Sequence, residues 1–135
     1  MDHVLILGAS SDLAKPLALH YAKAGYGLYL ITKTLEKSER LKKDLAIRTN
    51  TSVKTGVYDA EAPETAAECW AALDPKPVGV ICLIGYLGDE KKAQHEFKEA
   101  KRIIDSNYTG CVALLQQAAN CFAGLGQGFI DPHAR

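Results

Sequence analysis

The sequence predicts an α/β fold: a three-layer, doubly wound parallel sheet with helices on both faces, incomplete and containing four to five strands. Short apolar runs alternate with amphipathic stretches, which favours strands joined by helical crossovers. The run at 78–84 is almost wholly apolar and rich in β-branched residues, as is typical of a strand covered on both faces. The chain has 135 residues, 47% of them hydrophobic, which suits one domain with its own core.

The expected strands are short apolar runs. They cover residues 4–7, 28–31, 53–57 and 78–84, and a fifth begins at Phe129. Right-handed crossovers place the first strand in the centre, between the second and the fourth, with a ligand crevice at the carboxyl ends of the first and fourth. The fifth run leaves the apolar pattern at Asp131, so the fourth strand is expected to be an unprotected edge.

Four amphipathic stretches predict the helices. The first runs from about 12 to 24 and stops at Gly25, the second follows a possible cap at Thr34, and the third opens at Pro63. The fourth is the longest, because apolar residues recur at steps of three or four between 93 and 122. This pattern predicts one continuous amphipathic helix.

Charge and hydropathy argue against several classes of partner. Lysine plus arginine and aspartate plus glutamate both number 16, so the formal charge is zero and nucleic acid is an unfavoured partner. No apolar stretch approaches the roughly 20 residues that span a bilayer, and the N-terminus lacks the features of a signal peptide. We therefore expect a cytoplasmic protein without a membrane segment.

Cysteines and histidines show no metal-ligand spacing. The cysteines have no C-x-x-C pair, and we expect small buried hydrophobic residues at Cys69, Cys82, Cys111 and Cys121. We expect surface or cap positions, and no metal site, for His3, His20, His95 and His133.

The turn after the first strand is the first candidate site. It reads Gly8, Ala9, Ser10, Ser11, Asp12, Leu13 and Ala14. Open amides at a helix start attract phosphate, and Gly8 would let the backbone approach a diphosphate. The G-x-x-x-G-x-G spacing has Asp12 and Ala14 in place of two glycines, so an ordinary strand-to-helix turn capped by serine is the alternative.

This turn resembles the cofactor loop of the short-chain dehydrogenase/reductase family, and three further matches follow in the family's order. Asp59 matches the acidic residue that contacts the adenine amino group. Residues 82–85 end with Ile84 and Gly85 where the family has N-N-A-G, with only the glycine kept. Asn107 matches the asparagine that bends the long helix and holds a water in the proton relay.

The resemblance implies that residues 1–135 form a single, partial NAD(P)-binding domain of Rossmann-like type. It implies an oxidoreductase that transfers hydride between a nicotinamide and a small carbonyl or alcohol substrate. The implied cofactor contacts are Gly8, Ser10, Ser11, Asp12, Leu13, Thr32, Lys33, Asp59, Ile84 and Gly85. Asn107 is the implied relay position.

The end of the second strand bears on cofactor choice. An acidic residue there would bond the ribose 2′-hydroxyl of NAD, but the sequence reads Ile31-Thr32-Lys33-Thr34. Lys33 could pair with the 2′-phosphate of NADP, and a threonine hydroxyl could help. We therefore expect NADP (NADPH) to be preferred over NAD; a solvated lysine at Lys33 is the alternative.

The catalytic residues that the resemblance implies, a serine and a Tyr-x-x-x-Lys pair, are not found. Tyr29 and Lys33 have that spacing but fall on a strand, where residues four apart lie roughly 13 Å from one another. We therefore expect a truncated, catalytically incomplete form; a non-enzymatic cofactor-binding or assembly module is the alternative. We also expect a homo-oligomer, because apolar residues of the long helix such as Leu114 and Leu115 should be exposed.

Overall fold

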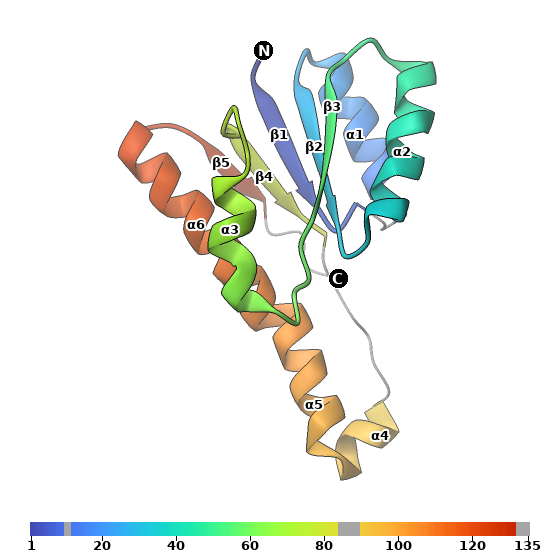
Figure 1. Ribbon diagram of the computed structural model, residues 1–135, viewed down its shortest axis with the longest axis vertical. Coiled ribbons are helices and arrows are strands. Elements are labelled where there is room, and N and C mark those ends of the chain that lie inside the picture. Colours follow the sequence, from blue (N-terminus) through green and yellow to red (C-terminus); the bar gives the residue numbers. More distant parts are fainter. Residues whose placement is uncertain (10–11, 84–89, 132–135) are drawn as a thin grey trace.

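The computed structural model describes residues 1–9, 12–83 and 90–131, and it contains a five-stranded parallel sheet (Figure 1). The strand order is β3-β2-β1-β4-β5, so β1 is central as predicted. The strands are β1 (His3–Leu7), β2 (Gly27–Thr32), β3 (Val53–Val57), β4 (Gly79–Cys82) and β5 (Phe129–Asp131). All described pairings are parallel, so the carboxyl ends of the strands share one edge of the sheet.

Helices cover both faces of the sheet, which confirms the three layers (Figure 1). One face packs against α1 (Ala14–Lys23) and α2 (Leu35–Arg48). The other packs against α3 (Ala66–Ala71), which continues the 3-10 turn η1 (Pro63–Thr65), and against α6 (Gly110–Leu125).

The alternation of side chains along β1 builds both halves of the core. Val4 and Ile6 face the cluster beneath α1 and α2, whereas Leu5 and Leu7 face the cluster beneath α3 and α6. All four side chains are fully buried. Burial of each contributes about 1.5–3 kcal/mol, so this central strand fixes the sheet between its helices.

The fourth strand is not an edge, so that prediction was wrong. Gly79 of β4 pairs with Phe129 of β5, and the Phe129 N–H donates to the Val78 carbonyl at 3.0 Å. The left-handed C-cap Gly126 ends α6 at φ +72° and turns the chain back toward the sheet. Three residues are enough to cover β4 and make β5 the outer strand.

The single long helix that periodicity predicted is divided into four segments. They are α4 (Glu90–His95), α5 (Phe97–Ile104), the π-helical turn η2 (Asp105–Thr109) and α6. Glu96 separates the first two, because its backbone is extended at φ −122° and ψ 112°. In Figure 1, α4 and α5 lie beyond the end of the sheet, so only α6 has a sheet to pack against.

That placement reverses the expected exposure of the long-helix residues. Leu114 is fully buried and Leu115 is half-buried against the core, so the prediction that they are exposed was wrong. Between residues 93 and 122, the exposed large apolar side chains instead lie on α5, η2 and the start of α6. They are Phe97, Ile104, Tyr108 and Val112.

Two smaller expectations also changed. His3 is buried within the fold, with its ring nitrogens bonded to the Met1 carbonyl and the Ser52 hydroxyl. Thr34 is at the N-cap position of α2, but its side chain makes no capping hydrogen bond.

Within the described ranges, no helix combines the length and hydropathy that crossing a bilayer requires.

Candidate functional site

The turn after β1 contains a glycine at a position where the backbone of any other residue would be strained. Gly8 has φ +83°, a backbone conformation that glycine adopts most readily. The N–H groups of Gly8 and Ala9 both donate to the Ile31 carbonyl, at 2.9 and 3.1 Å. These two amides tie the turn to β2, so they are not the open phosphate-binding amides that the sequence suggested.

The remainder of the turn leads into α1. Leu13 is the N-cap residue without a side-chain capping bond, and Asp12 and Leu13 are both exposed. Ser10 and Ser11 lie outside the described residues, as do Ile84 and Gly85 after β4. The described part of the turn therefore leaves Asp12 and Leu13 accessible at the start of the helix.

The end of β2 presents a lysine to solvent. Thr32 is buried, and its hydroxyl donates to the Thr34 carbonyl, so this hydroxyl already has an acceptor. The Lys33 side chain is 55% exposed, and its ammonium lies 3.2 Å from a carboxylate oxygen of Glu61. Lys33 is therefore the accessible cation that the sequence predicted, already paired with an acid.

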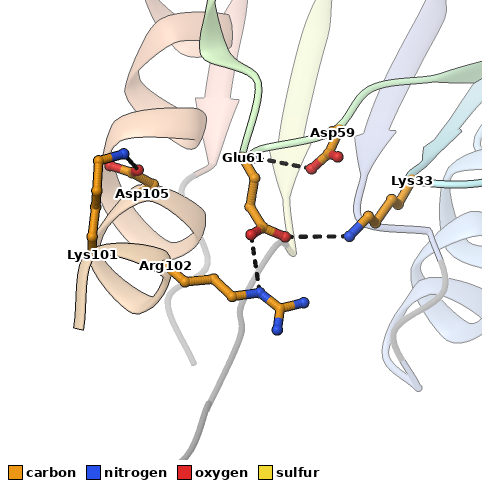
Figure 2. A network of polar contacts seen from close by, with 6 residues as sticks. All are labelled: Lys33, Asp59, Glu61, Lys101, Arg102 and Asp105. Atoms are coloured by element: carbon orange, nitrogen blue, oxygen red, sulfur yellow. Dashed lines mark hydrogen bonds and ion pairs between the residues drawn. The ribbon is translucent and has the colours of Figure 1, made fainter. Parts of the chain in front are cut away.

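That acid comes from the segment after β3. Asp59 accepts a hydrogen bond from the Glu61 N–H at 2.9 Å, which is a local turn typical of aspartate. The Glu61 carboxylate bonds Lys33 through one oxygen and Arg102 of α5 through the other, the latter at 2.9 Å (Figure 2). One carboxylate thus bridges two cations from distant parts of the chain.

A close helix approach fixes the position of this segment. A Cβ at Gly110 would lie 2.2 Å from the Ala60 carbonyl oxygen, so only glycine allows α6 to pack against residue 60 at this distance. The Tyr58 hydroxyl donates to the Gly110 carbonyl at 2.6 Å. Burial, followed by the influence of the neighbouring Cys111 thiol, raises the pKa of Tyr58 to about 12, so the phenol stays protonated as a donor.

Asn107 falls in the π-helical turn η2, directly before this contact. A π-helical turn inside a helix is uncommon and occurs often at functional sites. The relay role of Asn107 stays a prediction, and its side chain lies outside what the structure describes.

Two buried cysteines join the end of β4 to the start of α6. The Cys82 thiol donates a hydrogen bond to the Cys111 sulfur, with the two Sγ atoms 3.4 Å apart, and neither cysteine forms a disulfide. The hydrogen bond to Cys82 and burial raise the pKa of the Cys111 thiol well above its usual range. Both are core residues, as predicted, and among the described residues no cluster of histidine, cysteine and carboxylate side chains could hold a metal ion.

Tyr29 and Lys33 do not form a catalytic pair. Tyr29 is buried in the core, and its hydroxyl donates to the Pro75 carbonyl at 2.6 Å, whereas the Lys33 ammonium bonds Glu61. The two side chains have separate partners, which confirms the interpretation of this motif as a strand segment.

A charged depression of about 500 Å³ lies beside the Glu61–Arg102 pair. The described residues that line it carry four negative and four positive charges, supplied by α4, α5, η2, Glu61 and Glu96. Its lining includes the Lys101–Asp105 pair, which lies on a different side of α5 from Arg102 (Figure 2). The eight charges sum to zero, so the depression as a whole does not favour an anion, and the sheet edge that Glu61 and Arg102 border is the better candidate site.

The sequence reasoning missed Glu61, Arg102, Tyr58 and Gly110. Glu61 had a usable signal, since it follows Asp59 by two residues and therefore lies at the same sheet edge. Arg102 had none, because its approach depends on the tilt of α5 relative to the sheet.

The residues at the carboxyl edge fit a dinucleotide. A positive-φ glycine ends β1, a lysine ends β2 and an aspartate follows β3, and parallel pairing brings all three to one edge. In doubly wound folds the diphosphate and the ribose of a dinucleotide bind at this edge of the sheet.

Comparisons with known proteins agree with this arrangement. The family model for short chain dehydrogenases matches residues 2–130. The chain is 30% identical over 132 residues to a sulfoacetaldehyde reductase of Chromohalobacter salexigens, covering 94% of this chain and 51% of that protein. It is 28% identical over 122 residues to a very-long-chain 3-oxoacyl-CoA reductase of Vanderwaltozyma polyspora, covering 85% and 35%.

Solved structures show the same fold. A short-chain dehydrogenase from Sphingobium yanoikuyae, solved in complex with NADPH, superposes with a TM-score of 0.78 at 24% identity. The match covers 96% of this chain and 52% of that one. The chain therefore spans about a third to a half of the length of the proteins it matches.

Proposed function

Because this chain belongs to the short-chain dehydrogenase family, we propose that it binds a nicotinamide dinucleotide at the carboxyl edge of its sheet and prefers NADP(H) to NAD(H). The observation that carries the proposal is Lys33, an exposed cation at the end of β2, where an NAD-preferring site has an acid. The dehydrogenase from Sphingobium yanoikuyae, which has the same fold, was solved in complex with NADPH, and this supports the proposal of a nicotinamide dinucleotide as cofactor.

The proposed binding roles follow the order of the strands. The turn after β1 receives the diphosphate, the end of β2 the adenosine ribose, and the segment after β3 the adenine. The residues assigned to this site are Gly8, Ser10, Ser11, Asp12, Leu13, Thr32, Lys33, Asp59, Ile84 and Gly85. Thr32 contributes by shaping the strand end, because its hydroxyl is bonded to the Thr34 carbonyl.

The reaction class we propose for the protein is reduction of a carbonyl or oxidation of an alcohol. The bound nicotinamide supplies or accepts the hydride. The chain's own residues bind and orient the dinucleotide, and Asn107 takes the relay position at the bend of the long helix.

The 135 residues contain one Tyr-x-x-x-Lys, and its two side chains have separate partners on β2. We therefore propose that residues 1–135 act as one NAD(P)-binding domain that binds cofactor without turnover by itself. Reduction of a carbonyl substrate by the purified chain with NADPH would contradict this.

A second candidate function is an assembly module. It is favoured by the exposed apolar side chains Phe97, Ile104, Tyr108 and Val112, which lie along α5, η2 and the start of α6. Such a group of exposed apolar residues is typical of an association surface. A homo-oligomer of this chain is the simplest form of that function.

Calorimetric titration of the wild type and Lys33→Glu with NADPH and NADH tests the main proposal. Lys33→Glu removes a cation and adds a charge that repels the 2′-phosphate. We expect NADPH binding to weaken at least about tenfold, which corresponds to about 1.4 kcal/mol, with NADH changed far less.

The matched control is Lys23→Glu, since Lys23 is an exposed lysine at the C-terminal end of α1, away from the turn after β1. It makes the same charge change away from the carboxyl edge and should leave both dissociation constants unaltered. Tighter binding of NADH than of NADPH by the wild type would defeat the proposed preference.

A further inference from the structure

Glu61 bridges Lys33 and Arg102 beside the end of β2, the strand end to which the proposed function assigns the adenosine ribose. Any role of this bridge in cofactor choice therefore rests on the proposed function. Lys33 comes from the end of β2, Glu61 from the segment after β3 and Arg102 from α5 (Figure 2). Two cations and one carboxylate leave a net charge of +1 on these three side chains.

We propose that Glu61 competes with the 2′-phosphate of NADP(H), and that Arg102 is a second cation for that phosphate. In the free protein the Glu61 carboxylate holds the Lys33 ammonium at 3.2 Å and the Arg102 Nε at 2.9 Å. Binding of NADP(H) moves the carboxylate aside, and the phosphate takes both cations. Glu61 and Arg102 are then residues that determine cofactor specificity.

The exchange is favourable because the bridge is weak and the phosphate is a stronger partner. The side chains of Lys33, Glu61 and Arg102 are 55%, 32% and 42% exposed, so water screens both ion pairs and each contributes little. A phosphate monoester carries a charge of about −1.5 to −2 at neutral pH, against −1 for a carboxylate. Its oxygens also match the planar guanidinium of arginine for paired hydrogen bonds.

Arg102 is well placed for this role. Its position on α5 brings a guanidinium toward the end of β2 from the opposite side to Lys33, with the Glu61 carboxylate between them (Figure 2). A phosphate in the place of that carboxylate would contact both cations without a change in the backbone.

The opposite role for Glu61 predicts different binding. In that role its carboxylate accepts the ribose 2′-hydroxyl, as the acid at the end of β2 does in NAD-preferring sites. Glu61→Gln would then weaken NADH, because the ribose 2′-hydroxyl would lose its charged acceptor. Competition instead predicts that Glu61→Gln tightens NADPH and leaves NADH nearly constant.

The experiment is calorimetric titration of the purified wild type, Glu61→Gln and Arg102→Gln with NADPH and NADH. We expect Glu61→Gln to tighten NADPH roughly fivefold, the upper range for an exposed ion pair, with NADH within about twofold. Arg102→Gln should weaken NADPH roughly tenfold, again with little effect on NADH. The two variants therefore move NADPH affinity in opposite directions.

The controls repeat each charge change at the opposite edge of the sheet. Asp2→Asn removes an exposed acid directly before β1, and Lys23→Gln removes an exposed cation at the end of α1. Neither should alter the ratio of NADPH to NADH affinity. Unfolding temperatures of all four variants confirm that each is folded before titration.

The outcomes separate this inference from the proposed function. A wild type that prefers NADH, or binds neither nucleotide, contradicts both. A wild type that prefers NADPH while Glu61→Gln leaves NADPH unchanged or weaker contradicts the competition alone. A wild type that prefers NADPH while Arg102→Gln has no effect removes Arg102 from the site.

Discussion

Gly110→Ala tests the close approach that positions the Asp59–Glu61 segment. The added Cβ would lie 2.2 Å from the Ala60 carbonyl oxygen and 2.6 Å from the Ala60 Cα. Both are backbone atoms, so no side-chain rotation relieves the contact and α6 has to move away from residue 60. That movement also breaks or lengthens the 2.6 Å hydrogen bond from Tyr58 to the Gly110 carbonyl.

The expected cost combines three effects. Overpacking costs about 1–3 kcal/mol, and loss of the buried hydrogen bond costs about 1–3 kcal/mol. Replacing a helical glycine by alanine returns about 0.5–1 kcal/mol. We therefore expect a loss of about 2–4 kcal/mol, or about 10 °C in unfolding temperature for a domain of this size.

Urea unfolding followed by circular dichroism measures this loss. The matched control is Gly124→Ala in the same helix, because a Cβ at Gly124 meets no atom within 4 Å. Gly124→Ala should be neutral or slightly stabilising. A Gly110→Ala protein within about 0.5 kcal/mol of the wild type would refute the reasoning, since that is the range of a neutral surface substitution.

Three further predictions concern single groups. The stability of the wild type should fall between about pH 10 and 12, because the raised pKa keeps the Tyr58 phenol protonated in the folded state while the same phenol ionises in the unfolded chain. Tyr58→Phe should show a smaller fall, measured as the difference in the free energy of unfolding between pH 8 and pH 11. A thiol reagent at pH 8 should modify Cys121 before Cys111, because a hydrogen bond to Cys82 and burial raise the pKa of the Cys111 thiol. Mass mapping of the peptides measures the order, and modification of Cys111 first would contradict the prediction. Phe97→Glu should reduce self-association in sedimentation velocity, and a wild type that stays monomeric at high concentration would count against an association surface at this helix.

The sheet was largely predictable from the sequence because its strands are buried. Leu5, Ile6, Leu30 and Ile81 lie in runs that are apolar on both faces, and such runs have few other stable arrangements. The alternation of these runs with amphipathic stretches then predicted β1 between β2 and β4, whereas the position of β3 beside β2 was not predicted.

The long helix was mispredicted because periodicity does not report where the core ends. Phe97 and Ile104 continue the spacing of Cys111 and Phe122, yet they lie beyond the sheet and stay exposed. The extended backbone at Glu96 and the π-helical turn have no clear signal in propensity. Tertiary packing decides these features.

The candidate site was predictable only in part for a similar reason. Gly8, Lys33 and Asp59 follow strands, so the sheet alone brings them to one edge. The bridge of Glu61 to Arg102 spans 41 residues and depends on the direction of α5. Strand ends alone therefore indicated the cation Lys33 but not the acid that pairs with it.

The most direct test of a dinucleotide site at the carboxyl edge is an amide chemical-shift map of the labelled chain titrated with NADPH. We predict that the largest shifts fall at Gly8, Lys33, Asp59 and Glu61, at the ends of β1, β2 and β3. Residues at the opposite edge, such as Asp2 and Thr51, should hold their positions. Shifts confined to the opposite edge, or none at millimolar NADPH, would contradict a site at the carboxyl edge.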